Sequence, residues 1–191
     1  MGQRDHDGPA LPRSAGGAPG FGPGPDATVF LRPGELWTTD IPTRVKTVLG
    51  SCVAITMRAP RLGLASITHC LLPSAGGRPE TLSRSEALKY VDATIGILID
   101  TFASHGAAVS ELEVKLIGGA DNLQPSGAPS FYSVGGRNVQ MALDGLAQRG
   151  ITPVASIVGG RSGRVMVFDT ATGDVFVKVL SRVPRLLVEE S

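Results

Sequence analysis

The stretch Thr47-Val48-Leu49-Gly50-Ser51-Cys52-Val53-Ala54-Ile55 contains two apolar, β-branched runs that are separated by a Gly-Ser break, with a cysteine directly after it. Such runs favour strands, and the glycine between them favours a tight turn. A turn of this kind can lift the Cys52 side chain out of a sheet and direct successive backbone N–H groups toward one point. We therefore predict a nucleophilic role for Cys52, with Gly50, Ser51 and Val53 shaping the turn or supplying oxyanion donors.

The alternative for Cys52 is a small buried hydrophobe, which is the usual role of a free cysteine. His69 favours chemistry, because it ends the strand-like run Leu64–Thr68 and a neighbouring imidazole can activate a thiol. Successive side chains of an extended segment point to opposite faces, so Cys70 is predicted to lie in the core, away from His69. A metal site of Cys52, His69 and Cys70 fails the same test and lacks a fourth ligand, so we expect no metal.

Outward from this region, further β-branched runs predict about seven strands in all. They are Val45–Leu49, Val53–Met57, Leu64–Thr68, Glu113–Ile117, Val154–Val158, Val165–Asp169 and Val175–Leu180. The turn-rich segment between the last two predicts a hairpin.

Two amphipathic stripes predict helices. The first follows the capping-box spacing of Ser83 and Glu86 and ends at Gly106, and the second starts after Gly135-Gly136 and ends at Gly150. The predicted fold class is therefore α/β (α+β), a single mixed β-sheet of about seven strands with two main helices packed on one face.

Composition limits the classes of function. The chain has 191 residues and 19.8 kDa, enough for one ordinary domain, and its net charge of +1 gives no basic footprint for nucleic acid or for a membrane surface. Two cysteines are too few for a disulfide framework, and we find no secretory signal or charge-free span of transmembrane length. Residues 1–27 are predicted to be a disordered Gly/Pro-rich tail and residues 28–191 a single domain in a soluble, intracellular protein.

Two glycine-rich loops follow predicted strands, one with Gly118 and Gly119 and the other with Gly159 and Gly160. Neither has the spacing of a Walker or dinucleotide-binding loop, so nucleotide binding is unsupported. These glycines permit tight turns, or they let the backbone approach a substrate in a groove.

The chain resembles the CheD family of chemoreceptor glutamine deamidases over about residues 30–180. The residues that carry the resemblance are Leu49-Gly50-Ser51-Cys52-Val53, His69-Cys70-Leu71-Leu72-Pro73, Lys115-Leu116-Ile117-Gly118-Gly119-Ala120, Gly136-Arg137-Asn138-Val139, Gly159-Gly160, Gly163-Arg164, Phe168-Asp169 and Gly173.

The resemblance implies a Cys–His deamidase that converts receptor glutamines to glutamates without a cofactor, with Cys52 as nucleophile and His69 as acid and base. It also implies a threonine that assists the histidine. The simplest alignment puts Lys46 at that position, Thr47 is one step nearer Cys52, and Thr43 is three steps further away. We select Thr47, although a shift of one residue moves a strand side chain to the opposite face.

The partners implied by the resemblance are methyl-accepting chemotaxis receptors, as protein substrate, and the chemotaxis phosphatase CheC. The implied location is the cytoplasm, with recruitment to receptor arrays at the inner membrane. Three alternatives stay open: a mainly non-catalytic regulator of CheC, a receptor methylesterase with the same nucleophile, and a structural domain with an inert thiol.

Overall fold

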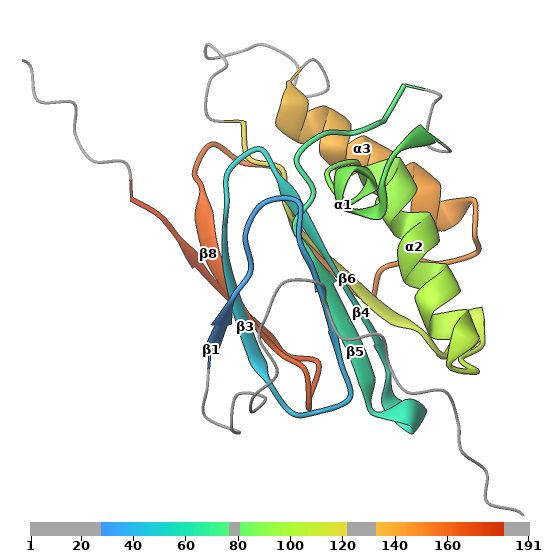
Figure 1. Cartoon of the computed structure of the whole chain (residues 1–191). Helices are drawn as coiled ribbons and strands as arrows, with labels where there is room; N and C mark the ends of the chain where they lie inside the picture. The colour runs from blue at the N-terminus through green and yellow to red at the C-terminus, as the bar shows by residue number, and fades with distance from the viewer. Residues whose placement is uncertain (1–27, 77–80, 122–132, 182–191) are drawn as a thin grey trace, which may run out of the picture.

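A computed structural model describes residues 28–76, 81–121 and 133–181. The predicted tail at residues 1–27 lies outside the described residues. Figure 1 shows two β-sheets packed face to face, with the helices on the outer side of one of them.

The strands form a four-stranded and a five-stranded sheet. The first has the order β1-β3-β8-β9, and the second has the order β2-β5-β4-β6-β7. Their bounds are β1 Thr28–Phe30, β2 Leu36–Thr39, β3 Arg44–Leu49, β4 Val53–Ala59, β5 Leu64–Thr68, β6 Glu113–Gly118, β7 Ala155–Val158, β8 Arg164–Asp169 and β9 Val175–Val179. The helices are α1 Arg84–Ala87, α2 Val91–Ser104 and α3 Val134–Ala147, with short 3₁₀ turns η1 at Pro60–Leu62 and η3 at Val109–Glu111.

The α+β class is confirmed, but the prediction of a single sheet is wrong. β3 pairs with β8, whereas β4, which follows it directly, pairs with β5 and β6. The Gly50–Cys52 turn therefore carries the chain from one sheet to the other instead of forming a hairpin. The physical reason is burial, because β3 alternates between exposed and buried residues while β4 is buried on both faces.

Each predicted strand is present, and β8 and β9 form the expected antiparallel hairpin. The strands β1 and β2 were not predicted from the sequence. Both are short, at three and four residues, so they offer little pattern to detect.

The first predicted helix is split into α1 and α2. The Ser83–Glu86 capping box starts α1 as expected, but the backbone of Tyr90 is extended and forms a bridge with Leu72 before α2 begins. The second helix starts earlier than predicted: Ser133 caps it, and Gly135 and Gly136 lie within its first turn.

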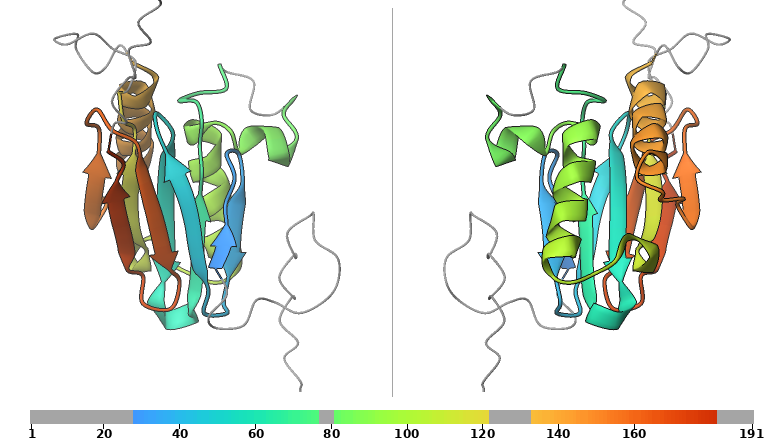
Figure 2. Two further views of the ribbon diagram at one scale, coloured as in Figure 1. Left: turned by 90° about the vertical axis from the view of Figure 1, so that its left-hand side faces the viewer. Right: turned by 90° about the vertical axis from the view of Figure 1, so that its right-hand side faces the viewer.

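The protein has two core layers, as the two views of Figure 2 illustrate. The helix layer lies between α2, α3 and the five-stranded sheet, and it includes Ile55, Phe102 and Leu146. The inter-sheet layer lies between the two sheets, and it includes Leu49 and Phe168. Each layer excludes water from one face of the five-stranded sheet, so β4 and β5 are buried almost completely.

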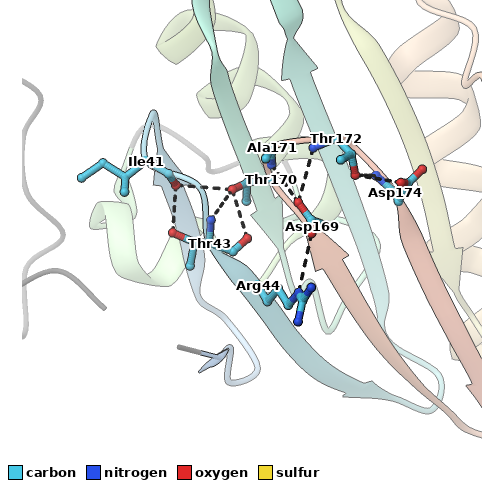
Figure 3. A network of polar contacts seen from close by, with 8 residues as sticks. All are labelled: Ile41, Thr43, Arg44, Asp169, Thr170, Ala171, Thr172 and Asp174. Atoms are coloured by element: carbon cyan, nitrogen blue, oxygen red, sulfur yellow. Dashed lines mark hydrogen bonds and ion pairs between the residues drawn. The ribbon is translucent and has the colours of Figure 1, made fainter. Parts of the chain in front are cut away.

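A polar network secures the end of the inter-sheet layer where β3 begins (Figure 3). The Thr43 backbone N–H donates to Thr170 Oγ1 at 2.8 Å, and the Thr170 hydroxyl donates to the Thr43 carbonyl at 3.0 Å. Asp169 accepts from the Ala171 N–H at 3.0 Å and forms an ion pair with Arg44 at 3.6 Å. These contacts hold the β8–β9 turn against the segment that crosses from β2 to β3.

Candidate active site

Cys52 lies on the turn that crosses between the sheets, at the opposite end of β3 from the polar network. The three carbonyls of this turn all accept hydrogen bonds from the protein. The Gly50 carbonyl accepts from the Ala120 N–H at 2.8 Å, and the Cys52 carbonyl accepts from the Gly119 N–H at 2.8 Å. The Ser51 carbonyl accepts from Asn138 Nδ2 at 2.9 Å. The turn is thus held from behind by the end of β6 and the start of α3.

Glycines allow the end of β6 and the start of α3 to approach the Cys52 turn closely. A Cβ on Gly118 would lie 2.3 Å from the Cys52 carbonyl oxygen, and Gly118 has a φ of 116°. A Cβ on Gly119 would lie 2.3 Å from a methyl group of Val139, and one on Gly135 would lie 2.6 Å from the Ala120 carbonyl oxygen. These contacts place Gly118 and Gly119 behind the Cys52 turn, and their role in a substrate groove stays a prediction.

The second glycine loop lies beside the first. The Gly159 N–H donates to the Gly118 carbonyl at 2.9 Å, and the Gly160 carbonyl accepts from the Asp121 N–H at 2.8 Å. Gly159 and Gly160 have φ values of 73° and 78°, which favour glycine at both positions. The two loops are therefore joined by backbone hydrogen bonds, and substrate contact at Gly159 and Gly160 stays a prediction.

The anchored carbonyls fix the directions of the turn's amides. In a trans peptide the C=O and N–H groups point in opposite directions. The Ser51 and Cys52 N–H groups therefore point away from Ala120 and Asn138. Among the residues that the structure describes, neither N–H donates to another residue. Two adjacent backbone donors without a partner in the described residues therefore lie at Cys52.

The Val53 N–H is not available as a donor. It donates to the Cys70 carbonyl at 3.0 Å, as part of the pairing between the start of β4 and the segment after β5. Of the two roles expected for Val53, oxyanion donation is excluded because the strand pairing uses its only N–H, and turn-shaping stays a prediction. Val53 marks where the turn ends.

His69 is buried, with 2% of its surface exposed, and it contacts the opposite sheet. Its Nδ1 lies 2.8 Å from Thr47 Oγ1, and the Thr47 hydroxyl lies 2.8 Å from the Leu31 carbonyl. The hydroxyl has one proton, and a carbonyl can only accept, so this proton goes to Leu31. Thr47 Oγ1 then accepts from Nδ1–H, which leaves Nε2 as the nitrogen with the free lone pair.

Of the three positions considered for the assisting threonine, only Thr47 contacts His69. Its side chain points into the inter-sheet layer, while Lys46 is exposed on the outer face of the same strand. Thr43 is bound to Ile41 and Thr170 at the other end of β3. The structure therefore brings Thr47 and His69 together.

Strand register puts Cys52 on the same face as His69. Val53 pairs with Cys70 in the register that β4 and β5 keep further along, as in Thr56 opposite Ile67. Continuing that register sets Ala54 opposite His69. Cys52 precedes Ala54 by two positions, so it is a diagonal neighbour of His69 on one face. Consistently, Cys52 packs against the inter-sheet layer and is partly exposed.

Cys70 lies in the other layer, as its position next to His69 predicted. It is fully buried against α2 and β4 in the helix layer. Its Sγ lies 3.7 Å from Thr68 Oγ1, and burial raises the pKa of the Cys70 thiol to about 11. This thiol has neither the access nor the ionisation that a nucleophile needs.

Electrostatics favour a neutral pair at the site. Burial raises the pKa of the Cys52 thiol, and the Cys52 backbone N–H opposes this shift. Burial lowers the pKa of His69, against the opposing effects of the Leu31 carbonyl and the Glu35 carboxylate. Both shifts favour a thiol beside a neutral imidazole over a preformed ion pair. His69 Nε2 is buried and has no hydrogen-bond partner among the described residues, so it is free to take a proton.

Sequence reasoning missed the groups that hold His69. The backbone N–H of His69 donates to the Glu35 carbonyl at 3.0 Å, and the backbone carbonyl of His69 accepts from the Gly34 N–H at 2.8 Å. The Leu31 carbonyl completes the set through Thr47. All three groups belong to the backbone, so residue type gives no signal for them.

Sequence reasoning also left Asn138 without a role. It is fully buried, and its Nδ2 donates to the carbonyls of Ser51 and Leu71 at 2.9 and 3.0 Å. The available signal was an amide side chain, Asn138, shortly after the glycine pair Gly135-Gly136.

Two broader properties are relevant to the site. No three side chains of the His, Cys, Asp or Glu type in the described ranges lie close enough to hold a metal ion. Of the helices within those ranges, none has the length and apolar character needed to span a membrane.

Known proteins match this chain over most of its length. The family model described as "CheD chemotactic sensory transduction" matches residues 71–179. A probable chemoreceptor glutamine deamidase CheD from Maridesulfovibrio salexigens is 41% identical over 157 residues, covering 81% of this chain and 92% of the relative. The chain belongs to the CheD family.

A second CheD relative supports the assignment. The probable chemoreceptor glutamine deamidase CheD 2 of Geobacter sulfurreducens is 41% identical over 154 residues, covering 81% of this chain and 91% of the relative. Among solved structures, the hypothetical protein YfiH of Bacillus licheniformis has a TM-score of 0.36 at 14% identity, covering 64% of this chain and 49% of that one. Similarity at that level carries no argument about this CheD family member.

Proposed function

We propose that the protein is a protein-glutamine deamidase that converts glutamines of methyl-accepting chemoreceptors to glutamates. The observation that carries the proposal is the free Nε2 of His69, fixed through Thr47 on the face that it shares with Cys52. Family membership supports the proposed substrate class, because the relatives are named probable chemoreceptor glutamine deamidases.

In the first half of the reaction, Cys52 Sγ attacks the side-chain amide carbon of a glutamine while His69 Nε2 takes the thiol proton. The S–C bond forms as the carbonyl π electrons move to oxygen, and the oxyanion accepts from the Ser51 and Cys52 N–H groups. When the oxyanion collapses, the C–N bond breaks and His69 returns the proton to the leaving nitrogen. The products are ammonia and a thioester.

In the second half, His69 Nε2 takes a proton from water, and the resulting hydroxide attacks the thioester carbon. Collapse of this second oxyanion breaks the C–S bond, and the Cys52 sulfur recovers its proton from His69. The net reaction converts glutamine and water to glutamate and ammonia. Each step uses groups of this chain, and none needs a cofactor.

Burial raises the pKa of the Cys52 thiol and lowers that of His69, so it disfavours both the thiolate and the imidazolium. In the proposed reaction, transfer of the thiol proton to His69 therefore accompanies attack on the amide carbon. An enzyme of this kind should react slowly with general alkylating agents and faster with a bound amide substrate. This restraint suits a protein that must modify few side chains.

The consequence for a receptor follows from charge. Each reaction adds a carboxylate to a helix bundle, and like charges on neighbouring helix positions repel one another. The reaction therefore biases the receptor between signalling states. On this proposal the protein works in the cytoplasm, at receptor arrays.

The test is mass spectrometry of a chemoreceptor cytoplasmic fragment incubated with the full chain. We expect Gln-to-Glu conversion at discrete sites with the wild type and with Cys70→Ala, and at least about a thousandfold slower conversion with Cys52→Ala. Cys70→Ala is the matched control, since it removes the other thiol from the helix layer. Conversion that persists in Cys52→Ala would contradict the proposed nucleophile.

Product analysis separates the main alternatives. Release of ammonia supports the deamidase, whereas release of methanol from a methylated fragment would identify a methylesterase. Binding of the phosphatase CheC without any conversion of the receptor would favour a regulatory module. In that case Cys52→Ala should bind CheC as well as the wild type does.

A further inference from the structure

Asn138 joins the two chain segments that carry the proposed nucleophile and base. Its Nδ2 donates to the Ser51 carbonyl, just before Cys52, and to the Leu71 carbonyl, two residues after His69. Both acceptors are carbonyls, so the two contacts fix which side-chain atom is the nitrogen. One amide group at the start of α3 therefore spans both segments.

The bond to Ser51 acts on an oxyanion donor. The Ser51 carbonyl and the Cys52 N–H belong to one peptide unit, so drawing the carbonyl toward Asn138 directs the N–H away from the helix. No other described residue donates to the Ser51 carbonyl. The orientation of this peptide unit thus depends on one side chain.

The other polar atom of the Asn138 side chain, Oδ1, has no hydrogen-bond partner among the described residues, although the side chain is fully buried. Most buried polar atoms are hydrogen-bonded, so the unpaired Oδ1 leaves the two contacts of Nδ2 as the hydrogen bonds of this side chain within the described part of the chain. The surrounding glycines, Gly119 and Gly135, bring α3 close enough for the contact.

We infer that Asn138 is a positioning residue that aims the Cys52 N–H at the oxyanion and sets its position relative to the His69 segment. This inference rests on the proposed function, because it concerns the same thiol chemistry. It applies to any acyl transfer to Cys52, whichever carbonyl compound is the substrate.

The inference separates two reactions of one thiol. Acylation by 4-nitrophenyl acetate forms an S–C bond through an oxyanion and then releases 4-nitrophenolate, so it needs the N–H donors. Alkylation by iodoacetamide displaces iodide at a saturated carbon and forms no oxyanion. A residue that acts through the donors should affect the first reaction and spare the second.

The experiment compares both rates in the full-length wild type, Asn138→Ala and Asn138→Leu, where leucine keeps the approximate size of the side chain and has no donor. We expect acylation to fall about 10- to 100-fold while alkylation stays within about twofold. Thr94→Val is the matched control, since it changes another fully buried polar side chain, on α2. It should leave both rates unchanged.

Two results would overturn the inference. The first is a parallel loss of acylation and alkylation with a lower melting temperature, which would identify a structural role. The second is an unchanged acylation rate in both Asn138 variants. Failure of the wild type to convert any receptor glutamine would instead contradict the proposed function, and the ratio of the two thiol reactions would still decide the role of Asn138.

Discussion

The two ends of the inter-sheet layer differ in how their threonine, histidine and asparagine side chains are paired, although Arg58 Nε at the end where β3 begins is also buried without a partner among the described residues. At the end where β3 begins, the hydroxyls of Thr43 and Thr170 both have hydrogen-bond partners (Figure 3). At the end where β3 finishes, His69 Nε2 and Asn138 Oδ1 are buried and have no partner within the described part of the chain. A buried polar atom without a partner destabilises the fold by about 1–3 kcal/mol. The hydrogen bonds at the first end hold the sheets together, and the second end carries the active site that we propose.

The same strand serves both ends. Thr43 directly precedes β3, which begins at Arg44, and Thr47 lies near the end of the strand. Each threonine contacts an element far away in sequence, Thr170 in one case and His69 in the other. The first two predictions below test whether the ends are as separable as this arrangement indicates, and the third tests whether His69 is buried in its neutral form.

The largest effect is expected on the deamidation rate, at the end of the inter-sheet layer that holds Cys52 and His69. Replacing Thr47 with valine keeps the shape of the side chain but removes the oxygen that accepts from His69 Nδ1–H. We expect receptor deamidation to fall about 10- to 100-fold, since groups that orient a catalytic imidazole commonly contribute that much. Initial rates of ammonia release measure it. An unchanged rate in a folded Thr47→Val variant would show that Thr47 does not orient the base.

The next effect is expected at the opposite end. Thr170→Val removes the acceptor of the Thr43 N–H and the donor to the Thr43 carbonyl. We expect a loss of about 1–2 kcal/mol in the free energy of unfolding, measured in urea, because the Thr43 amide is then buried without a partner.

Activity provides the control for this variant. Deamidation per folded Thr170→Val molecule should match the wild type, since Thr170 lies at the far end of β3 from Cys52. A fall in activity as large as that of Thr47→Val would mean that the two ends are coupled, and the comparison would fail.

The smallest effect is expected in the free energy of unfolding as the pH is lowered. Burial lowers the pKa of His69 in the folded protein below its unfolded value of about 6.5. Between these two pKa values the unfolded chain binds more protons, so the free energy of unfolding falls as the pH drops below about 6.5. His69→Gln should remove this part of the pH dependence in denaturant titrations from pH 7.5 downward. Curves of identical slope for wild type and variant would contradict a neutral, buried His69.

Much of the fold could be predicted from the sequence because its signals are local. Alternating or continuous apolar residues defined the main strands, and the Ser83–Glu86 capping box located the start of α1. The parity of neighbouring residues correctly separated His69 from Cys70. The short strands β1 and β2 gave too little pattern, and the number of sheets was wrong because hydrogen-bond partners of strands are not encoded locally.

The site could be predicted only in part, for the same reason. Cys52, His69 and Thr47 carry side chains whose chemistry is visible in the sequence. The Leu31 and Glu35 carbonyls act through the backbone, which looks alike at every residue. Asn138 is visible as a residue type, but its contacts join positions 51, 71 and 138, which only the folded chain brings together.

By itself, the sequence determined which residues can do chemistry and which faces of each strand are apolar, because both are properties of single residues and their close neighbours. Only the tertiary structure decided that the Gly50–Cys52 turn crosses between two sheets. It also decided that the Val53 N–H donates to the Cys70 carbonyl and that Thr47 forms a hydrogen bond with His69. These outcomes depend on pairing and burial between distant segments, where long-range packing selects one arrangement from several that the local pattern permits.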